Sequence, residues 1–67
     1  MKKYILKAPF GSVLAPMGAI DEQKLRDYGV QITDATWHEK FKNDPIEDVI
    51  GYFRSIGYSV EAFNKLN

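Results

Sequence analysis

The sequence predicts a small α+β domain with the ferredoxin-like βαββαβ order, in which two helices cover one face of an antiparallel sheet. Two observations lead to this prediction. Several short segments alternate apolar and polar residues, as half-buried strands do, and one longer segment repeats its apolar residues at helical spacing. The chain has 67 residues, 45% of them hydrophobic, so we expect a single domain over residues 1–67.

The first element is a strand over residues 2–8. Tyr4 and Leu6 would lie on one face, and Ile5 would lie among lysines on the other. The strand ends at Pro9, since proline cannot donate to a strand ladder. A loop over residues 8–20 follows, in which the pattern Ala-Pro-apolar-Gly occurs twice. Proline and glycine at these spacings favour two successive turns.

The middle of the chain begins with a short helix. Asp21 is a suitable cap, and Gly29 would end the helix after residue 28. Residues 30–33 then alternate as a strand does. Residues 34–43 fit two structures. Their threonine and aromatic residues favour a strand, although an Asp cap and the i, i+4 spacing of two aromatics would also suit a helix.

The clearest helix begins near residue 45. Asp44 could cap it, Pro45 would occupy its first position, and Glu47 has capping-box spacing. Its apolar stripe consists of Ile46, Val49, Ile50, Phe53 and Ile56. Gly57 would end the helix, and the alternation over residues 58–63 favours a final strand over a short second helix. If residues 34–43 are helical, the alternative architecture is a smaller sheet packed under three short helices.

Catalytic chemistry finds little support in the sequence. His38, next to Glu39, is the one candidate general base, and no nucleophile motif accompanies it. The chain has no cysteine, and its histidine and carboxylates show no metal-ligand spacing. We therefore expect no catalytic residue, no metal and no cofactor, and we do not expect an enzyme.

Membrane insertion is not expected either. No window approaches the ~20 apolar residues of a membrane span. The basic start of the chain is not followed by the uninterrupted apolar run of a secretory signal. We expect a cytoplasmic protein without a membrane partner.

The leading functional hypothesis is a protein-binding module that acts as a regulator or inhibitor, as small proteins of bacteriophages and mobile elements often do. The loop over residues 8–20 holds many apolar side chains among its prolines and glycines, which is typical of an interface. The predicted anchors are Phe10, Val13, Leu14 and Met17. The partner would be another protein, or a second copy in a homodimer.

Single-stranded nucleic acid is the alternative partner. Basic and aromatic residues interleave on two of the predicted strands, whose open sheet face could stack bases. The residues concerned are Lys3, Tyr4, Lys7, Trp37, Lys40 and Lys42. The sequence contains no ribonucleoprotein-type motif, and its net charge is zero.

The zero net charge combines two unlike segments. Residues 1–20 hold three lysines and no acid, which gives +3. Residues 21–67 hold six basic and nine acidic residues, which gives −3. This separation of charge along the chain favours a binding surface on one side of the domain, although the two segments could also attract each other within the fold.

Overall fold

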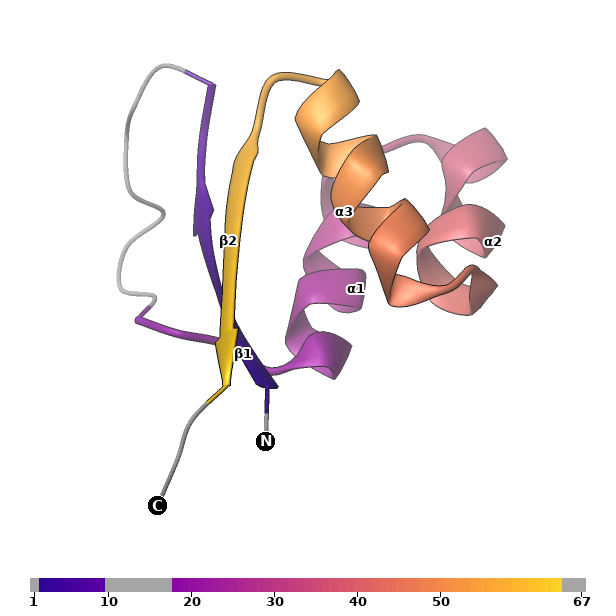
Figure 1. Ribbon diagram of the computed structural model, residues 1–67. Helices are drawn as coiled ribbons and strands as arrows, with labels where there is room; N and C mark the ends of the chain where they lie inside the picture. The colour runs from indigo at the N-terminus through magenta and orange to yellow at the C-terminus, as the bar shows by residue number, and fades with distance from the viewer. Residues whose placement is uncertain (1, 10–17, 65–67) are drawn as a thin grey trace.

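The computed structural model describes residues 2–9 and 18–64. The elements in chain order are β1 (Lys2–Lys7), α1 (Glu22–Ile32), α2 (Ala35–Asn43), α3 (Ile46–Ser55) and β2 (Ser59–Asn64). The described helices lie on one side of a two-stranded antiparallel sheet, where α1 packs on β1 and α3 on β2 (Figure 1). The predicted α+β class is therefore confirmed, and so is the alternative architecture of a smaller sheet packed under three short helices.

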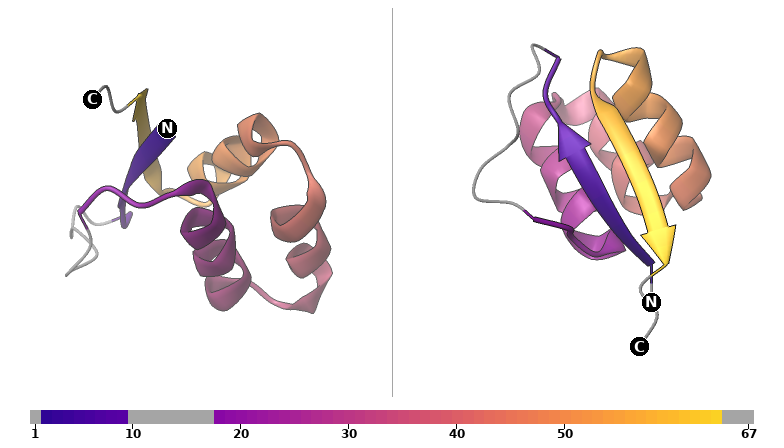
Figure 2. Two further views of the ribbon diagram at one scale, coloured as in Figure 1. Left: turned by 90° about the horizontal axis from the view of Figure 1, so that it is seen from below. Right: turned by 60° about the vertical axis from the view of Figure 1, so that its left-hand side comes forward.

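The sheet joins the first and last elements of the chain, which lie side by side in both views of Figure 2. Its register pairs Tyr4 with Ala62 and Leu6 with Val60. On its other edge, β1 forms an isolated bridge to Ile20. The Tyr4 N–H donates to the Ile20 carbonyl, and the Ile20 N–H donates to the Tyr4 carbonyl, both at 2.8 Å. β1 is thus the central strand, with hydrogen bonds on both edges.

The strand predicted over residues 30–33 was wrong, because α1 continues to Ile32. The Asp21 cap is confirmed, since its carboxylate accepts a hydrogen bond from the Lys24 N–H at 2.9 Å. Gly29 does not end the helix; it is buried against the ring of Phe41. A Cβ at this position would clash with the Phe41 ring. Glycine stands here because the two helices approach so closely.

The strand preferred for residues 34–43 was also wrong, because this segment forms α2. The Asp34 carboxylate caps the helix by accepting hydrogen bonds from the Thr36 N–H at 3.1 Å and the Thr36 hydroxyl at 2.6 Å. Trp37 and Phe41, one turn apart, pack with their ring centroids 6.3 Å apart. Burial of Phe41 in the core outweighs the strand preference of the individual residues. With both middle strands absent, the four-stranded ferredoxin-like order is not found in the described parts of the chain.

The predicted helix after residue 45 is confirmed as α3, but its start differs. Pro45 takes the N-cap position and forms no side-chain cap. The Asp44 carboxylate, predicted to cap α3, instead accepts a short hydrogen bond from the Tyr52 hydroxyl. The aspartate therefore ties the α2–α3 turn to the second half of α3.

The end of α3 agrees with the prediction. Gly57 has a φ of 95°, a conformation that glycine adopts without strain. Its N–H donates to the Arg54 carbonyl at 3.0 Å, and the Tyr58 N–H donates to the Phe53 carbonyl at 2.9 Å. These two bonds form a Schellman motif, which stops the helix and leads the chain into β2. The predicted final strand is confirmed.

The core lies between the sheet and the helices. Its buried hydrophobic residues are Tyr4, Leu6, Ile20, Leu25, Phe41, Val49, Phe53 and Val60. Phe41 and Phe53 meet edge to face at its centre, with ring centroids 5.0 Å apart. Within the described ranges, no helix is both long enough and apolar enough to cross a bilayer.

Candidate functional site

The four predicted partner anchors, Phe10, Val13, Leu14 and Met17, lie outside the described residues, but both ends of their loop are described. At one end, Pro9 packs close to Gly57, since a Cβ on that glycine would lie 3.2 Å from the Pro9 Cβ. At the other end, the backbone N–H and carbonyl of Ile20 are both hydrogen-bonded to the backbone of Tyr4. The loop therefore starts and ends at fixed points against the body of the domain.

An exposed apolar side chain precedes Gly57, the residue that the start of this loop approaches. Of the large hydrophobic residues that the structure describes, Ile56 is the exposed one, at 41%. The sequence placed it in the buried stripe of α3. The helix ends at Ser55, however, and Ile56 is its C-cap residue, with a φ of −102° and a ψ of 16°. Its position beside a helix-ending glycine was the signal that could have identified it.

The structure does not bring the six predicted nucleic-acid contacts onto one sheet face. Tyr4 points into the core and is 1% exposed. Burial raises the pKa of its hydroxyl, and the nearby charges of Glu22 and Glu47 raise it further. The other five residues divide between β1 (Lys3 and Lys7) and α2 (Trp37, Lys40 and Lys42). Because α2 lies on the side of the helical layer away from the sheet, these groups are on different faces (Figure 2).

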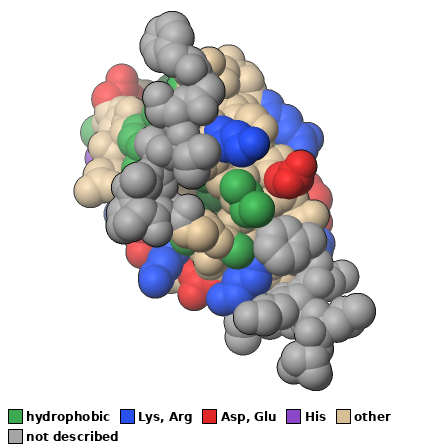
Figure 3. Space-filling model, turned by 90° about the vertical axis from the view of Figure 1, so that its left-hand side faces the viewer, with side chains coloured by type: hydrophobic (Ala, Val, Ile, Leu, Met, Phe, Trp, Pro, Cys, Tyr) green, Lys and Arg blue, Asp and Glu red, His purple; other side chains and the backbone are tan. Residues whose placement is uncertain are grey.

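The outer face of the sheet is not covered by any described helix (Figure 1). The alternation of the strands places these residues on it: Lys3, Ile5 and Lys7 from β1, and Ser59 and Glu61 from β2. Figure 3 shows hydrophobic surface on this side flanked by basic and acidic side chains. An apolar centre with a charged rim is typical of protein interfaces, although this one is small.

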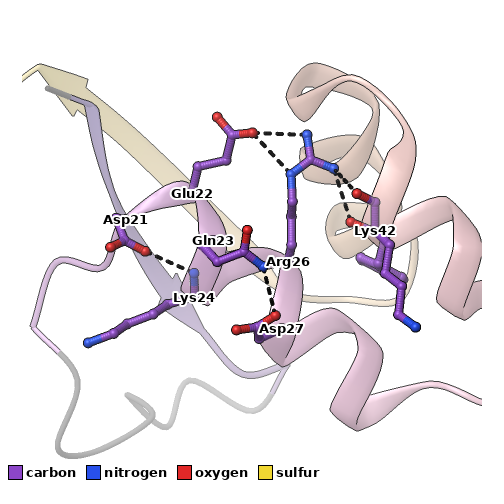
Figure 4. Close-up of polar contacts among 8 residues, drawn as sticks. Asp21, Glu22, Gln23, Lys24, Arg26, Asp27 and Lys42 are labelled. Atoms are coloured by element: carbon purple, nitrogen blue, oxygen red, sulfur yellow. Dashed lines mark hydrogen bonds and ion pairs between the residues drawn. The ribbon is translucent and has the colours of Figure 1, made fainter.

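Arg26 is the most strongly bonded of the described charged groups, and it has a structural role (Figure 4). Its Nε and Nη2 each lie 3.0 Å from the Glu22 carboxylate. Its Nη1 donates to the carbonyls of Phe41 at 3.1 Å and Lys42 at 3.2 Å. A cation at the last carbonyls of a helix satisfies groups that lack helical partners. The guanidinium thus joins α1 to the end of α2.

His38, the one candidate general base, also contacts the backbone. Its Nε2 lies 2.9 Å from the carbonyl oxygen of Thr33, just after α1. The side chain therefore links the end of α1 to α2. In residues 2–9 and 18–64 no group of three or more histidine or carboxylate side chains is placed to hold a metal ion.

The exposed groups described above lie in two regions. One is the start of the loop over residues 8–20, with Ile56 beside it. The other is the sheet, with its uncovered outer face and the edge of β2 that faces away from β1. Comparisons of this chain with protein-family models, with curated proteins and with solved structures found no match.

Proposed function

We propose that this protein is a non-enzymatic binding module that engages another protein through the loop over residues 8–20. The observation that carries the proposal is the exposure of Ile56, which precedes Gly57, the residue that Pro9 approaches at the start of the loop. Ile56 would add to the apolar side chains that the sequence of the loop supplies. We further propose that the protein acts in the cytoplasm as a regulator or inhibitor, of the kind that bacteriophages and mobile elements encode.

The fixed ends of the loop support this role. The paired bonds to Tyr4 hold one end, and packing on Gly57 holds the other. Two prolines within the segment restrict its backbone further. Such restraints lower the conformational entropy that a binding loop loses when it meets its partner. Phenylalanine and methionine side chains can then act as anchors, because each buries a large apolar area.

The test begins with affinity capture from cells that carry the gene, using the full chain as bait. The dissociation constant of the captured protein is then measured for Phe10→Ala and Met17→Ala. We expect each to weaken binding by about tenfold or more, as truncation of an interface anchor does, with little change in melting temperature. Glu39→Ala, at an exposed position on α2, is the control and leaves the affinity unchanged. Two results would contradict the proposal: capture of no protein, or loop variants that unfold without changing the affinity.

Single-stranded nucleic acid is the competing partner in the same assay. A labelled oligothymidine is titrated at ~50 mM salt and again at higher salt, because phosphate contacts weaken as salt rises. Since the six predicted contacts lie on different faces, we expect no salt-dependent binding. Tight, salt-sensitive binding that Lys40→Ala and Lys42→Ala weaken would replace the protein-binding proposal.

A further inference from the structure

Within residues 2–9 and 18–64, no strand pairs with the edge of β2 that faces away from β1. The N–H and the carbonyl of Tyr4 both bond to Ile20, so they point away from β2. Residues of an antiparallel pair alternate between hydrogen-bonded and non-hydrogen-bonded positions. Tyr4–Ala62 and Leu6–Val60 are therefore non-hydrogen-bonded pairs. It follows that the N–H and carbonyl groups of Val60 and Ala62 point to the free edge of β2.

Helix α3 runs alongside this edge. The Nη2 of Arg54 donates to the Val60 carbonyl at 3.0 Å, which places the Arg54 side of the helix next to the outward-pointing backbone of β2. Ile50 and Ile46 lie one and two turns before Arg54 on the same side of the helix. Both are half-buried and pack against the core. Figures 1 and 2 show α3 beside β2 in each view, beyond the edge of the sheet.

The inner side of this edge is open at Ala62. Alternation places Ala62 on the same face as Tyr4 and Val60, which are 1% and 4% exposed. Ala62 itself is exposed. A side chain from an added strand therefore has access to an apolar position between β2 and α3.

Two charged side chains lie at the edge itself: Arg54, which bonds to the Val60 carbonyl, and Glu61. Glu61 is exposed on the outer face of β2, directly next to the edge. Among the described residues the one ion pair is Arg26–Glu22, so Glu61 is not paired there. An incoming strand with basic side chains on its outer face would neutralise the Glu61 carboxylate.

We propose that the free edge of β2 is a strand-addition site for an extended segment of a partner protein that alternates basic and apolar residues. The segment pairs with the N–H of Val60 and with both backbone groups of Ala62, while Arg54 keeps the Val60 carbonyl. Its apolar side chains face Ala62 and Ile50, and its basic side chains lie beside Glu61. This main-chain recognition resembles other cases in which a peptide extends a sheet edge.

This site goes beyond the proposed loop surface. The loop ends at Ile20 on the opposite edge of β1, but it starts at Pro9 near Gly57, two residues before β2, so the Phe10→Ala comparison below is needed to separate the two sites. A second copy of this chain is a less suitable occupant of the β2 edge. In the two-fold registers centred near the middle of β2, its own Glu61 would lie opposite or diagonal to the first, where like charges destabilise pairing.

The experiment follows backbone amide exchange by NMR in the full chain. In the free protein we expect the amides of Val60 and Ala62 to exchange about tenfold or more faster than that of Glu61, which is paired with Ile5. The probe is a short acetylated peptide of alternating lysine and valine. When it binds, the Val60 and Ala62 amides become protected to the level of Glu61. Slow exchange at Val60 and Ala62 in the free monomer would overturn the proposal.

Three comparisons make the result specific. A peptide of alternating glutamate and valine binds about tenfold or more weakly than the lysine peptide, and Glu61→Lys reverses this preference. Glu39→Lys, the same charge change on α2, leaves the preference as it was. A lysine–valine peptide with N-methylated valines does not bind, because it cannot extend the ladder. Binding of this methylated peptide, or a Glu61→Lys variant without any reversal, would overturn the proposal.

The remaining outcomes also decide the question. No binding of the lysine peptide overturns the strand-addition site. Protection of β2 amides together with a doubled mass in solution makes a second copy the occupant and overturns the partner segment. Phe10→Ala retains peptide binding, which separates this site from the loop surface. If the loop variants fail their own test while the peptide still binds, the strand-addition site stands without the proposed function.

Discussion

The interface between α1 and α2 is packed far more tightly than the edge of β2. At the first, a single methyl group on Gly29 would run into the ring of Phe41, which is fully buried. At the second, Ala62 lies exposed on the inner face of the sheet. The difference follows from the widths of the layers. Neighbouring strands lie about 5 Å apart and packed helices about 8–10 Å apart, so two strands cannot cover both α1 and α3.

The largest expected effect is at the tight interface. Gly29→Ala should destabilise the protein by about 1–3 kcal/mol, as overpacking of a core does. Gly51→Ala is the matched control, because Gly51 also lies inside a helix but has open space around it. That substitution should stabilise by roughly 0.5–1 kcal/mol through helix propensity. Urea unfolding monitored by circular dichroism measures both changes.

The cause of the Gly29→Ala effect can be isolated by a double substitution. If the loss comes from the clash with the Phe41 ring, it should shrink by about 1 kcal/mol or more in a Phe41→Leu background, since residues in contact are energetically coupled. Equal losses in the two backgrounds would mean that the α1–α2 contact is not the source. The α1–α2 interface could then no longer be described as more tightly packed than the edge of β2.

The second effect concerns the turn that carries the chain from α3 into β2. Gly57→Ala should destabilise by roughly 1–2 kcal/mol, because an L-residue is strained in the left-handed region. The added methyl would also come within 3.2–3.3 Å of Pro9. Thermal unfolding measures the loss, and Gly51→Ala again supplies the control. A neutral result would show that the turn can shift, and with it the start of the β2 edge.

How far the sequence predicts this fold depends on the element. The two strands at the ends and α3 could be identified because alternation, helical spacing and Gly57 all agree locally. The middle of the chain could not. Gly29 is a helix-ending residue by local rules, and only the approach of Phe41 from the next helix explains its place within α1. A contact between distant residues overrides local preference there.

The same limit applies to the candidate sites. Tyr4 belonged to the predicted nucleic-acid face, and its partner strand was expected to hold Trp37. Because residues 34–43 form a helix rather than the predicted strand, the residues of that face do not lie on one surface. The edge of β2 could not be predicted at all, because it depends on which strands are missing beside it. Ile56 was assigned to the buried stripe since its spacing continued by one residue past the end of the helix.

The third prediction tests whether the β2 edge is open at Ala62. Ala62→Val adds two methyl groups to an exposed strand position and should change the free energy of unfolding by no more than about 0.5 kcal/mol. The same urea titrations measure Gly29→Ala and Ala62→Val. The free-energy cost of adding methyl groups can therefore be compared directly between the α1–α2 interface and the β2 edge. A loss above about 1 kcal/mol would mean that Ala62 is already packed. The β2 edge would then have no room for an added strand.

The smallest expected effect is the pH dependence of stability at the α2–α3 turn, where the Tyr52 hydroxyl donates to the Asp44 carboxylate. This hydrogen bond, together with burial and the Asp44 charge, raises the pKa of Tyr52 from 10.0 to about 12. A raised pKa in the folded state stabilises the fold fully below pH 10, and this contribution is lost as pH rises from 10 to about 12. The unfolding midpoint of the wild type should therefore fall across this window.

Two variants assign this pH effect to the Tyr52–Asp44 pair. Tyr52→Phe should be less stable than the wild type at neutral pH and should lose less stability at high pH, because it has no hydroxyl to titrate. Asp44→Asn should bring the pKa of Tyr52 back toward 10.0, as followed by tyrosinate absorbance. If the Tyr52 signal titrates at the same pH with and without the Asp44 carboxylate, the hydrogen bond does not hold the α2–α3 turn as described. Because β2 takes no part in this pair, amide exchange at Val60 and Ala62 should be the same in both variants as in the wild type.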